Sequence, residues 1–160
     1  MKPVLILTFL TLSNFIFGQI NSTKDIILAN PNYNKELAEK LGGDKFGMKS
    51  YFFVILKTGS NTTTDKKIIS DSFKGHMDNI HHLVEKGKLI IAGPMAKNEN
   101  NYRGIFVLNN IKTIEEVNQL MQTDLAIKNG ILAYDIFTWY GSAALPEYLP
   151  VADKIWELKP

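Results

Sequence analysis

Four stretches of the chain have the length and apolar character of β-strands. The first, residues 51–56, is apolar at every position. A strand that is apolar on both alternating faces belongs to a sheet that is covered on both sides. Residues 88–92, 103–108 and 131–140 form the other three stretches, and Gly, Pro or Asn residues beside them mark turns. The pattern therefore predicts a sheet of four strands.

The apolar period becomes helical between the first and second strands. In residues 71–86 apolar residues recur at intervals of four, three and four positions, before a glycine at position 87. They are Phe73, Met77, Ile80 and Val84. Between the third and fourth strands, Thr113 and Glu116 form a capping box, which predicts the start of a second helix. The order of elements is β-α-β-β-α-β, and it predicts an α+β fold of the ferredoxin-like sandwich type.

Two helices can cover only one face of such a sheet. The other face is also apolar in the first strand, because Tyr51, Phe53 and Ile55 alternate with apolar neighbours. The simplest group to cover this second face is the same sheet of another copy of the chain. We therefore expect a homodimer that forms through the sheet faces.

The chain outside this core divides into three segments. Residues 1–18 have a Lys2 start, an apolar stretch and a small final residue, which is the layout of a signal peptide. They predict an exported protein, periplasmic or secreted, with no membrane association after cleavage; a buried N-terminal helix or strand is the alternative. Residues 19–47 are predicted to form an N-terminal arm. Residues 142–160 form a C-terminal tail, whose three prolines suggest an extended segment.

Charge and composition exclude several functions. The chain of 160 residues has 18 basic and 16 acidic side chains, a net charge of +2, and therefore no electrostatic footprint for nucleic acid. It has no cysteine, which excludes disulfides, thiolate nucleophiles, iron–sulfur clusters and zinc sites of the cysteine type. Nucleotide-binding, acyl-transfer and zinc-protease motifs are absent from the sequence. We expect neither a metal nor a cofactor.

His76 is the histidine with the strongest case for chemistry. It stands at the edge of the apolar stripe of the first helix, and Asp124, just before the last strand, is its best candidate partner. A carboxylate bonded to one imidazole nitrogen fixes the tautomer and leaves the other nitrogen for acid–base work without a metal. The alternatives are a structural histidine and a helix-capping aspartate. His81 and His82 are expected to be solvated.

Other side chains could bind a substrate. Lys74 and Arg103 could meet an anionic substrate, although isolated surface cations would explain them equally well. Several aromatic residues could line an apolar pocket, and a place in the core or in a dimer interface is their alternative. These aromatic residues are Tyr102, Tyr134, Trp139 and Tyr140.

Residues 76–95, HMDNIHHLVEKGKLIIAGPM, resemble the YCII-related (YciI-like) family of small dimeric α+β barrel proteins. The family pattern is a histidine, an apolar-periodic helix, a glycine, a strand and Ala-Gly-Pro, and the chain matches it at each step. Further matches extend the resemblance over residues 48–141, which we therefore expect to be a YCII-related domain. The resemblance implies a ferredoxin-like protomer, a dimeric α+β barrel and a pocket with a His–Asp pair at His76 and Asp124. The chain has Leu125 where the family usually has proline.

The family is similar in fold and pocket to muconolactone isomerases and related dehalogenases. By this analogy, the chain is expected to be a cofactor-independent acid–base isomerase or lyase, or a dehalogenase-like enzyme. Its substrate would be a small cyclic or aromatic acid or lactone. The alternative is a non-catalytic dimer that binds a small ligand or serves as an accessory protein, because export and additional arms suggest interaction surfaces.

Overall fold

The computed structural model describes residues 30–157. The predicted signal peptide and the first part of the predicted arm lie outside the described residues. The chain divides into two units, with the boundary between Tyr33 and Asn34, and the second unit contains all the elements below. In the part that the structure describes, no helix is both long and apolar enough to cross a membrane.

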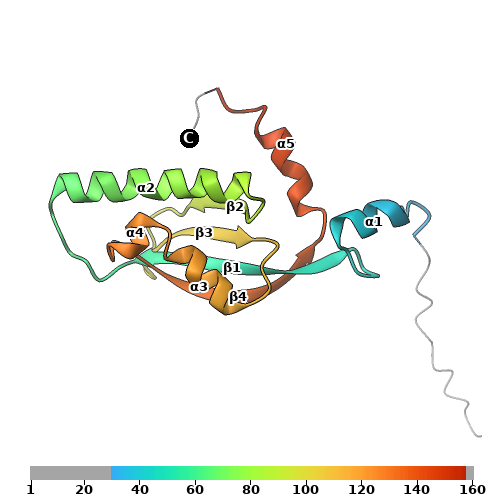
Figure 1. Cartoon of the computed structure of the whole chain (residues 1–160), viewed down its shortest axis with the longest axis horizontal. Helices are drawn as coiled ribbons and strands as arrows, with labels where there is room; N and C mark the ends of the chain where they lie inside the picture. The colour runs from blue at the N-terminus through green and yellow to red at the C-terminus, as the bar shows by residue number, and fades with distance from the viewer. Residues whose placement is uncertain (1–29, 158–160) are drawn as a thin grey trace, which may run out of the picture. The chain divides into compact units, whose positions relative to one another are not determined.

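The second unit is an α+β domain built on one antiparallel sheet (Figure 1). Its elements are α1 (Lys35–Leu41), β1 (Met48–Thr58), α2 (Lys66–Glu85), β2 (Leu89–Pro94), β3 (Tyr102–Leu108), α3 (Ile114–Met121), α4 (Leu125–Lys128), β4 (Leu132–Ser142), the 3-10 helix η1 (Leu145–Tyr148) and α5 (Leu149–Ala152). The strands lie in the order β2-β3-β1-β4, and every neighbouring pair is antiparallel. The predicted ferredoxin-like β-α-β-β-α-β fold is confirmed.

Helix α2 begins earlier than the apolar period predicts. The Asp65 side chain accepts hydrogen bonds from the backbone N–H groups of Lys67 and Ile68. These two N–H groups lie in the first turn, where they have no carbonyl partner within the helix. The helix therefore starts at Lys66 instead of residue 71. The five additional residues lengthen the helix over the sheet and place His76 near its middle.

Helices α2, α3 and α4 cover one face of the sheet (Figure 1). Alternate residues of the central strand β1 point to this face, and they are buried against side chains from all three helices. These β1 residues are Phe52, Val54 and Leu56. Phe106 of β3 lies in the same core and is 1% exposed. This core supports the helix that carries His76.

The opposite face of the sheet holds a smaller apolar cluster. Tyr51 and Val107 are buried there, and Leu145 of η1 packs against them. The part of the face that β4 contributes is more open, because Phe137 and Trp139 are 49% and 38% exposed. Trp139 lies across from Tyr51 in the register, with ring centroids 5.6 Å apart. The expected homodimer through this face stays a prediction.

The C-terminal tail is helical where its prolines suggest an extended segment. Pro146 and Pro150 stand in the first turns of η1 and α5. Proline is tolerated at these positions because the first N–H groups of a helix have no partner within the helix, and its fixed φ suits the first turn. The Tyr148 hydroxyl donates a hydrogen bond of 2.5 Å to the carbonyl of Ile90. This bond attaches the tail to β2, an edge strand of the sheet.

Candidate functional site

His76 and Asp124 are joined by a buried hydrogen bond. The Nδ1 atom of His76 lies 2.6 Å from Oδ2 of Asp124, although the residues are 48 positions apart in the chain. The histidine side chain is 11% exposed and the aspartate side chain is fully buried. The structure thus brings together the two residues that the sequence analysis singles out. Nδ1 is engaged in the pair, and Nε2 is the nitrogen available for other contacts.

Asp124 has both of the roles that the sequence leaves open as alternatives. Its Oδ1 atom accepts hydrogen bonds from the backbone N–H groups of Ala126 at 2.9 Å and Ile127 at 3.4 Å, which caps α4. Its Oδ2 atom bonds to His76. Because each oxygen has its own partner, the capping bonds hold the carboxylate in a fixed orientation while it faces the imidazole.

A glycine allows the two helices that carry this pair to approach each other. A Cβ atom at Gly75 would lie 2.7 Å from Cβ and 2.9 Å from Cδ2 of Leu125. Such distances are shorter than a carbon–carbon contact permits, so no larger residue fits without a shift of α2 or α4. Gly75 and Leu125 adjoin His76 and Asp124 in the chain. The close approach therefore sets the distance within the pair, and no pattern in the sequence indicates this role of Gly75.

Two aromatic rings hold the His76 imidazole. It stacks on Phe106 with ring centroids 5.8 Å apart and an interplanar angle of 17°. Phe73 meets it edge to face, with centroids 6.2 Å apart and an angle of 87°. The ring has a hydrogen bond at Nδ1 and aromatic contacts at its face and side, so its orientation is restricted. This is the arrangement expected of a group that must present one nitrogen to a ligand.

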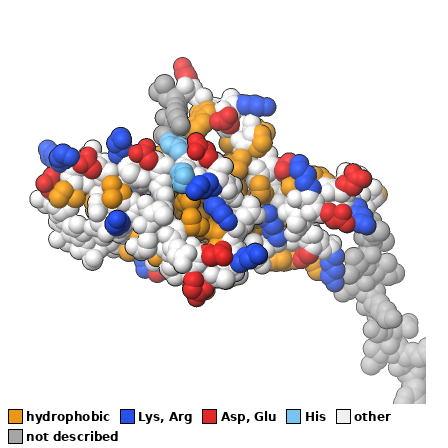
Figure 2. Space-filling view, viewed as in Figure 1, with side chains coloured by type: hydrophobic (Ala, Val, Ile, Leu, Met, Phe, Trp, Pro, Cys, Tyr) orange, Lys and Arg blue, Asp and Glu red, His pale blue; other side chains and the backbone are white. Residues whose placement is uncertain are grey.

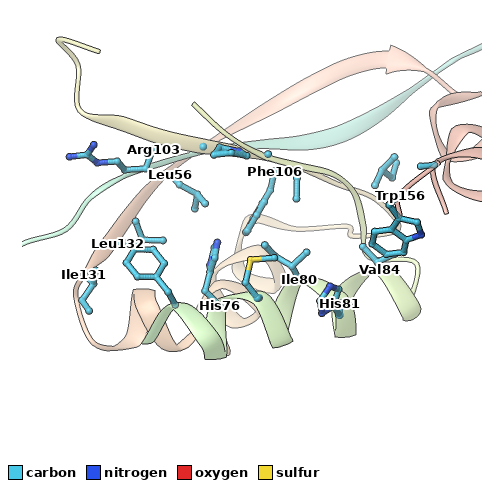
Figure 3. Close-up of a pocket in the computed structure, with 18 of the residues that line it drawn as sticks. Leu56, His76, Ile80, His81, Val84, Arg103, Phe106, Ile131, Leu132 and Trp156 are labelled. Carbon is cyan, nitrogen blue, oxygen red and sulfur yellow. The ribbon is translucent and has the colours of Figure 1, made fainter. Parts of the chain in front are cut away.

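A cavity of about 1450 Å³ opens beside His76. It runs along α2 between that helix and the sheet, and Figure 3 shows Arg103 and Ile131 at one end, Val84 and Trp156 at the other, and His76 between them. Its walls are mainly apolar and come from α2, all four strands and the tail. Ligand sites are typically apolar cavities of about 300–1000 Å³ with a few polar groups. This cavity is also mainly apolar with a few polar groups, and its volume exceeds that range.

Arg103 is the one Lys or Arg side chain that lines the cavity among the residues that the structure describes. Its Nε atom donates a hydrogen bond of 2.6 Å to Oγ1 of Thr58. This bond directs the guanidinium group and leaves its two terminal amino groups for an anion. Lys74 does not line the cavity: it is exposed on α2, with its Nζ 3.6 Å from a carboxylate oxygen of Asp78. Of the two predicted cations, only Arg103 lines the cavity that His76 also lines.

The predicted aromatic residues do not line the cavity either. Tyr102 begins β3, and its backbone groups bond to the side chain of Asn98. Trp139 lies on the sheet face that is opposite to α2, where it contacts Tyr51. The aromatic residues that contact the His76 imidazole are Phe73 and Phe106. Helical and strand periodicity predict a core position for both residues. Phe106 is buried as predicted, whereas Phe73 is 42% exposed and lines the cavity.

The tail contributes a wall that the sequence does not predict. Tyr148, Leu149 and Trp156 line the cavity together with the acidic side chains of Asp153 and Glu157. The Tyr148 hydroxyl donates to the Ile90 carbonyl of β2, and burial raises the pKa of this phenol above its ordinary value. The tail thus encloses one end of the cavity.

His81 also differs from its expected solvated position. It lines the cavity, and its Nε2 atom is buried without a hydrogen-bond partner among the described residues. His82, the next residue, is exposed as expected.

Within residues 30–157, no group of three or more His, Asp or Glu side chains has a geometry that could hold a metal ion. On the face shown in Figure 2, positive and negative side chains are interspersed.

The chain matches no protein-family model and no curated protein. Among solved structures, it is similar to 5-chloro-2-hydroxyhydroquinone dehydrochlorinase from Burkholderia phenoliruptrix, in a complex with 2,5-dihydroxybenzoquinone. The two chains share 19% sequence identity, with a TM-score of 0.39. The similarity covers 55% of this chain and 92% of the other.

Proposed function

We propose that this chain is an exported YciI-like protein that binds a small cyclic or aromatic acid or lactone and acts on it by acid–base catalysis. The observation that carries the proposal is the hydrogen bond between His76 and Asp124 at the wall of a large apolar cavity. A general base must present one nitrogen to the substrate in a fixed orientation. The buried carboxylate and the two aromatic contacts of His76 supply that orientation.

The proposed reaction begins with transfer of a proton from a carbon next to a carbonyl group to Nε2 of His76. Asp124 then stabilises the imidazolium through Nδ1–H. The electron pair left on the substrate forms an enolate. In an isomerisation, the imidazolium returns the proton to another carbon of the substrate. In an elimination, the electron pair expels a leaving group, and the imidazolium gives its proton to that group or to water. Neither route requires an oxidant or a reductant.

Arg103 is proposed to bind the carboxylate of the substrate. Its Nε is held by Thr58, and a planar guanidinium can meet both oxygens of a carboxylate with its remaining donors. Figure 3 shows Arg103 toward one end of the cavity and His76 nearer its middle. A ring bound between them would lie against the apolar walls with its reacting carbon beside His76.

The decisive experiment measures exchange of a carbon-bound proton. Muconolactone and a panel of phenylacetic acids, which carry a proton on the carbon next to the carbonyl group, are incubated with the protein in D₂O, and NMR follows the loss of that proton signal. We expect His76→Asn to slow exchange at least about 100-fold. His82→Asn, which changes an exposed histidine on the same helix, is the matched control and should leave the rate unchanged. Equal exchange in the wild-type and His76→Asn proteins would contradict catalysis by His76.

The same experiment distinguishes an enzyme from a binding protein. If the acids bind to the wild-type protein, as calorimetry would show, but no proton exchanges, the cavity belongs to a non-catalytic ligand-binding or accessory protein. Export is tested separately by the N-terminal sequence of the protein recovered outside the cytoplasm. The proposal expects it to begin within a few residues of Gln19.

A further inference from the structure

Two stripes of side chains follow α2 and face different parts of the molecule. The apolar stripe lines the cavity and consists of Ile69, Phe73, Met77, Ile80 and Val84. The buried stripe consists of Ser72, His76, Asn79 and Leu83. At about 100° per residue, the centres of the two stripes lie about 90° apart around the helix. The most deeply buried side of α2 is therefore its more polar side.

The two buried residues beside His76 in this stripe have partners in residues 123–129, the segment that contains α4. Oδ1 of Asn79 accepts a hydrogen bond of 2.8 Å from the Thr123 hydroxyl. Oγ of Ser72 accepts one of 2.8 Å from the side-chain amide of Asn129. We call these two the flanking bonds, because the bond of the His–Asp pair lies between them along both segments.

The flanking bonds restrict how far α2 can turn about its axis. Apolar side chains of similar shape could bury the same surface, but an apolar contact permits rotation and sliding, whereas a hydrogen bond requires a defined direction. Ser72 is 0% exposed and Asn79 is 8% exposed. A rotation of α2 would separate both from their partners and leave polar atoms buried without a hydrogen bond.

A rotation of α2 would also displace His76. Asn79 is three residues and Ser72 four residues away from it on the same helix, and Thr123 precedes Asp124 in the chain. Figure 3 shows the His76 ring projecting from α2 into the cavity, toward the sheet. The glycine contact limits how near α2 comes to α4, whereas the flanking bonds limit the direction in which the imidazole points.

We infer that the flanking bonds fix the rotation of α2 and thereby position His76 for proton transfer. The four residues that form them are positioning residues, because they act through the His–Asp pair; none of the four, all within the described part of the chain, lines the cavity. This inference rests on the proposed function, since the orientation serves the transfer of a proton to Nε2. It also explains why the buried side of α2 carries polar residues.

Thr123→Val tests the inference, because valine keeps the branched shape of threonine and removes the hydroxyl. The proton between Nδ1 of His76 and Oδ2 of Asp124 gives a downfield NMR signal that reports the geometry of this bond without any substrate. We expect that signal to move upfield in Thr123→Val. The rate of proton exchange from phenylacetate should fall about tenfold, while its affinity, measured by calorimetry, stays unchanged.

A conservative variant and a control accompany this measurement. Thr123→Ser keeps a hydroxyl and should restore most of the signal and of the rate. Ser72→Ala removes the other flanking bond and should lower the rate in the same way. Tyr134→Phe is the control, because it removes a hydrogen bond of 2.9 Å to Asn118, which joins β4 to α3 and involves neither α2 nor α4. It should leave both the signal and the rate unchanged.

The outcomes separate this inference from the proposed function. An unchanged signal and rate in both Thr123→Val and Ser72→Ala would overturn the inference and leave the proposed function standing. Equal losses in Thr123→Val and Thr123→Ser would overturn it too, because the hydroxyl would then not be the cause. A shifted signal in Thr123→Val, together with no proton exchange in the wild-type protein, would support the positioning of the pair and overturn the proposed catalysis.

Discussion

Gly75 of α2 lies against Leu125 of α4 so closely that a Cβ atom on Gly75 would be 2.7 Å from Cβ of Leu125. The next residue on α2 is His76, and the residue before Leu125 is Asp124. The contact between a glycine and a leucine therefore determines how near the imidazole comes to its carboxylate. The packing of α2 on α4 and the distance between His76 and Asp124 therefore depend on the same helix crossing.

Gly75→Ala is expected to destabilise the protein by about 1 kcal/mol or more. Alanine favours a helix by up to about 1 kcal/mol over glycine, but overpacking against Leu125 costs about 1–3 kcal/mol. Urea denaturation measures the change, and the rate of substrate proton exchange should fall with it. Gly93→Ala is the control for the urea measurement alone, because a Cβ there meets no atom within 4 Å but would enter the wall of the cavity. A more stable Gly75→Ala protein would show that α2 and α4 can separate freely.

Asp124→Asn and Asp124→Ala should differ in stability but share a loss of activity. Asparagine can keep the capping bonds to Ala126 and Ile127, whereas alanine loses them at a cost of about 1 kcal/mol. Both variants remove the carboxylate that faces His76, and the proton-exchange rate should decrease at least about tenfold in each. Thermal denaturation and the NMR exchange assay separate these effects. Full activity in Asp124→Asn would assign a capping role alone to Asp124.

Arg103→Lys should weaken the binding of benzoate about tenfold and leave the binding of benzamide unchanged. Lysine keeps the charge but loses both the planar donor group and the bond that Nε makes to Thr58. Lys74→Ala serves as the matched control, since this lysine is paired with Asp78 outside the cavity. Calorimetry gives both affinities. Equal loss for benzoate and benzamide would indicate a general change of the cavity instead of carboxylate recognition.

The attachment of the tail through Tyr148 should depend on pH. Burial raises the pKa of Tyr148 above its ordinary value of 10.0 in the folded protein. A raised folded pKa means that the stabilisation is complete below pH 10 and is lost as the pH rises through the raised value. The ultraviolet difference titration between wild-type and Tyr148→Phe proteins should show one phenol that ionises late. A phenol that ionises at its ordinary pKa would mean that the tail does not bury Tyr148 against β2.

Phe137→Glu should convert a dimer into a monomer. Phe137 and Trp139 are exposed on the sheet face opposite to α2, and we expect a second copy to cover them. A charged side chain at the centre of such an interface would prevent association. Light scattering after size exclusion measures the mass, and Ile68→Glu, at an exposed position of α2, is the control. A wild-type monomer at micromolar concentration would contradict the sheet-face dimer.

The fold could be predicted from the sequence because it depends on local periodicity. The apolar runs, the helical spacing of Phe73, Met77, Ile80 and Val84, and the capping box at Thr113 are each complete within one segment. Their order leaves few arrangements of the sheet. The prediction was less accurate for the tail, because proline disfavours the interior of a helix and is accepted in its first turn.

The candidate site, like the fold, could be predicted from the sequence only in part. The sequence by itself identified His76 and Asp124 as a candidate pair, and Arg103 and Lys74 as candidate cations, because residue type and position are properties of the chain. Only the tertiary structure decided that His76 meets Asp124, that Arg103 and not Lys74 lines the cavity, and that His81 and the tail form its far end. The physical reason is that these relationships are distances between segments far apart in the chain, and they are set by how closely the helices and sheet pack.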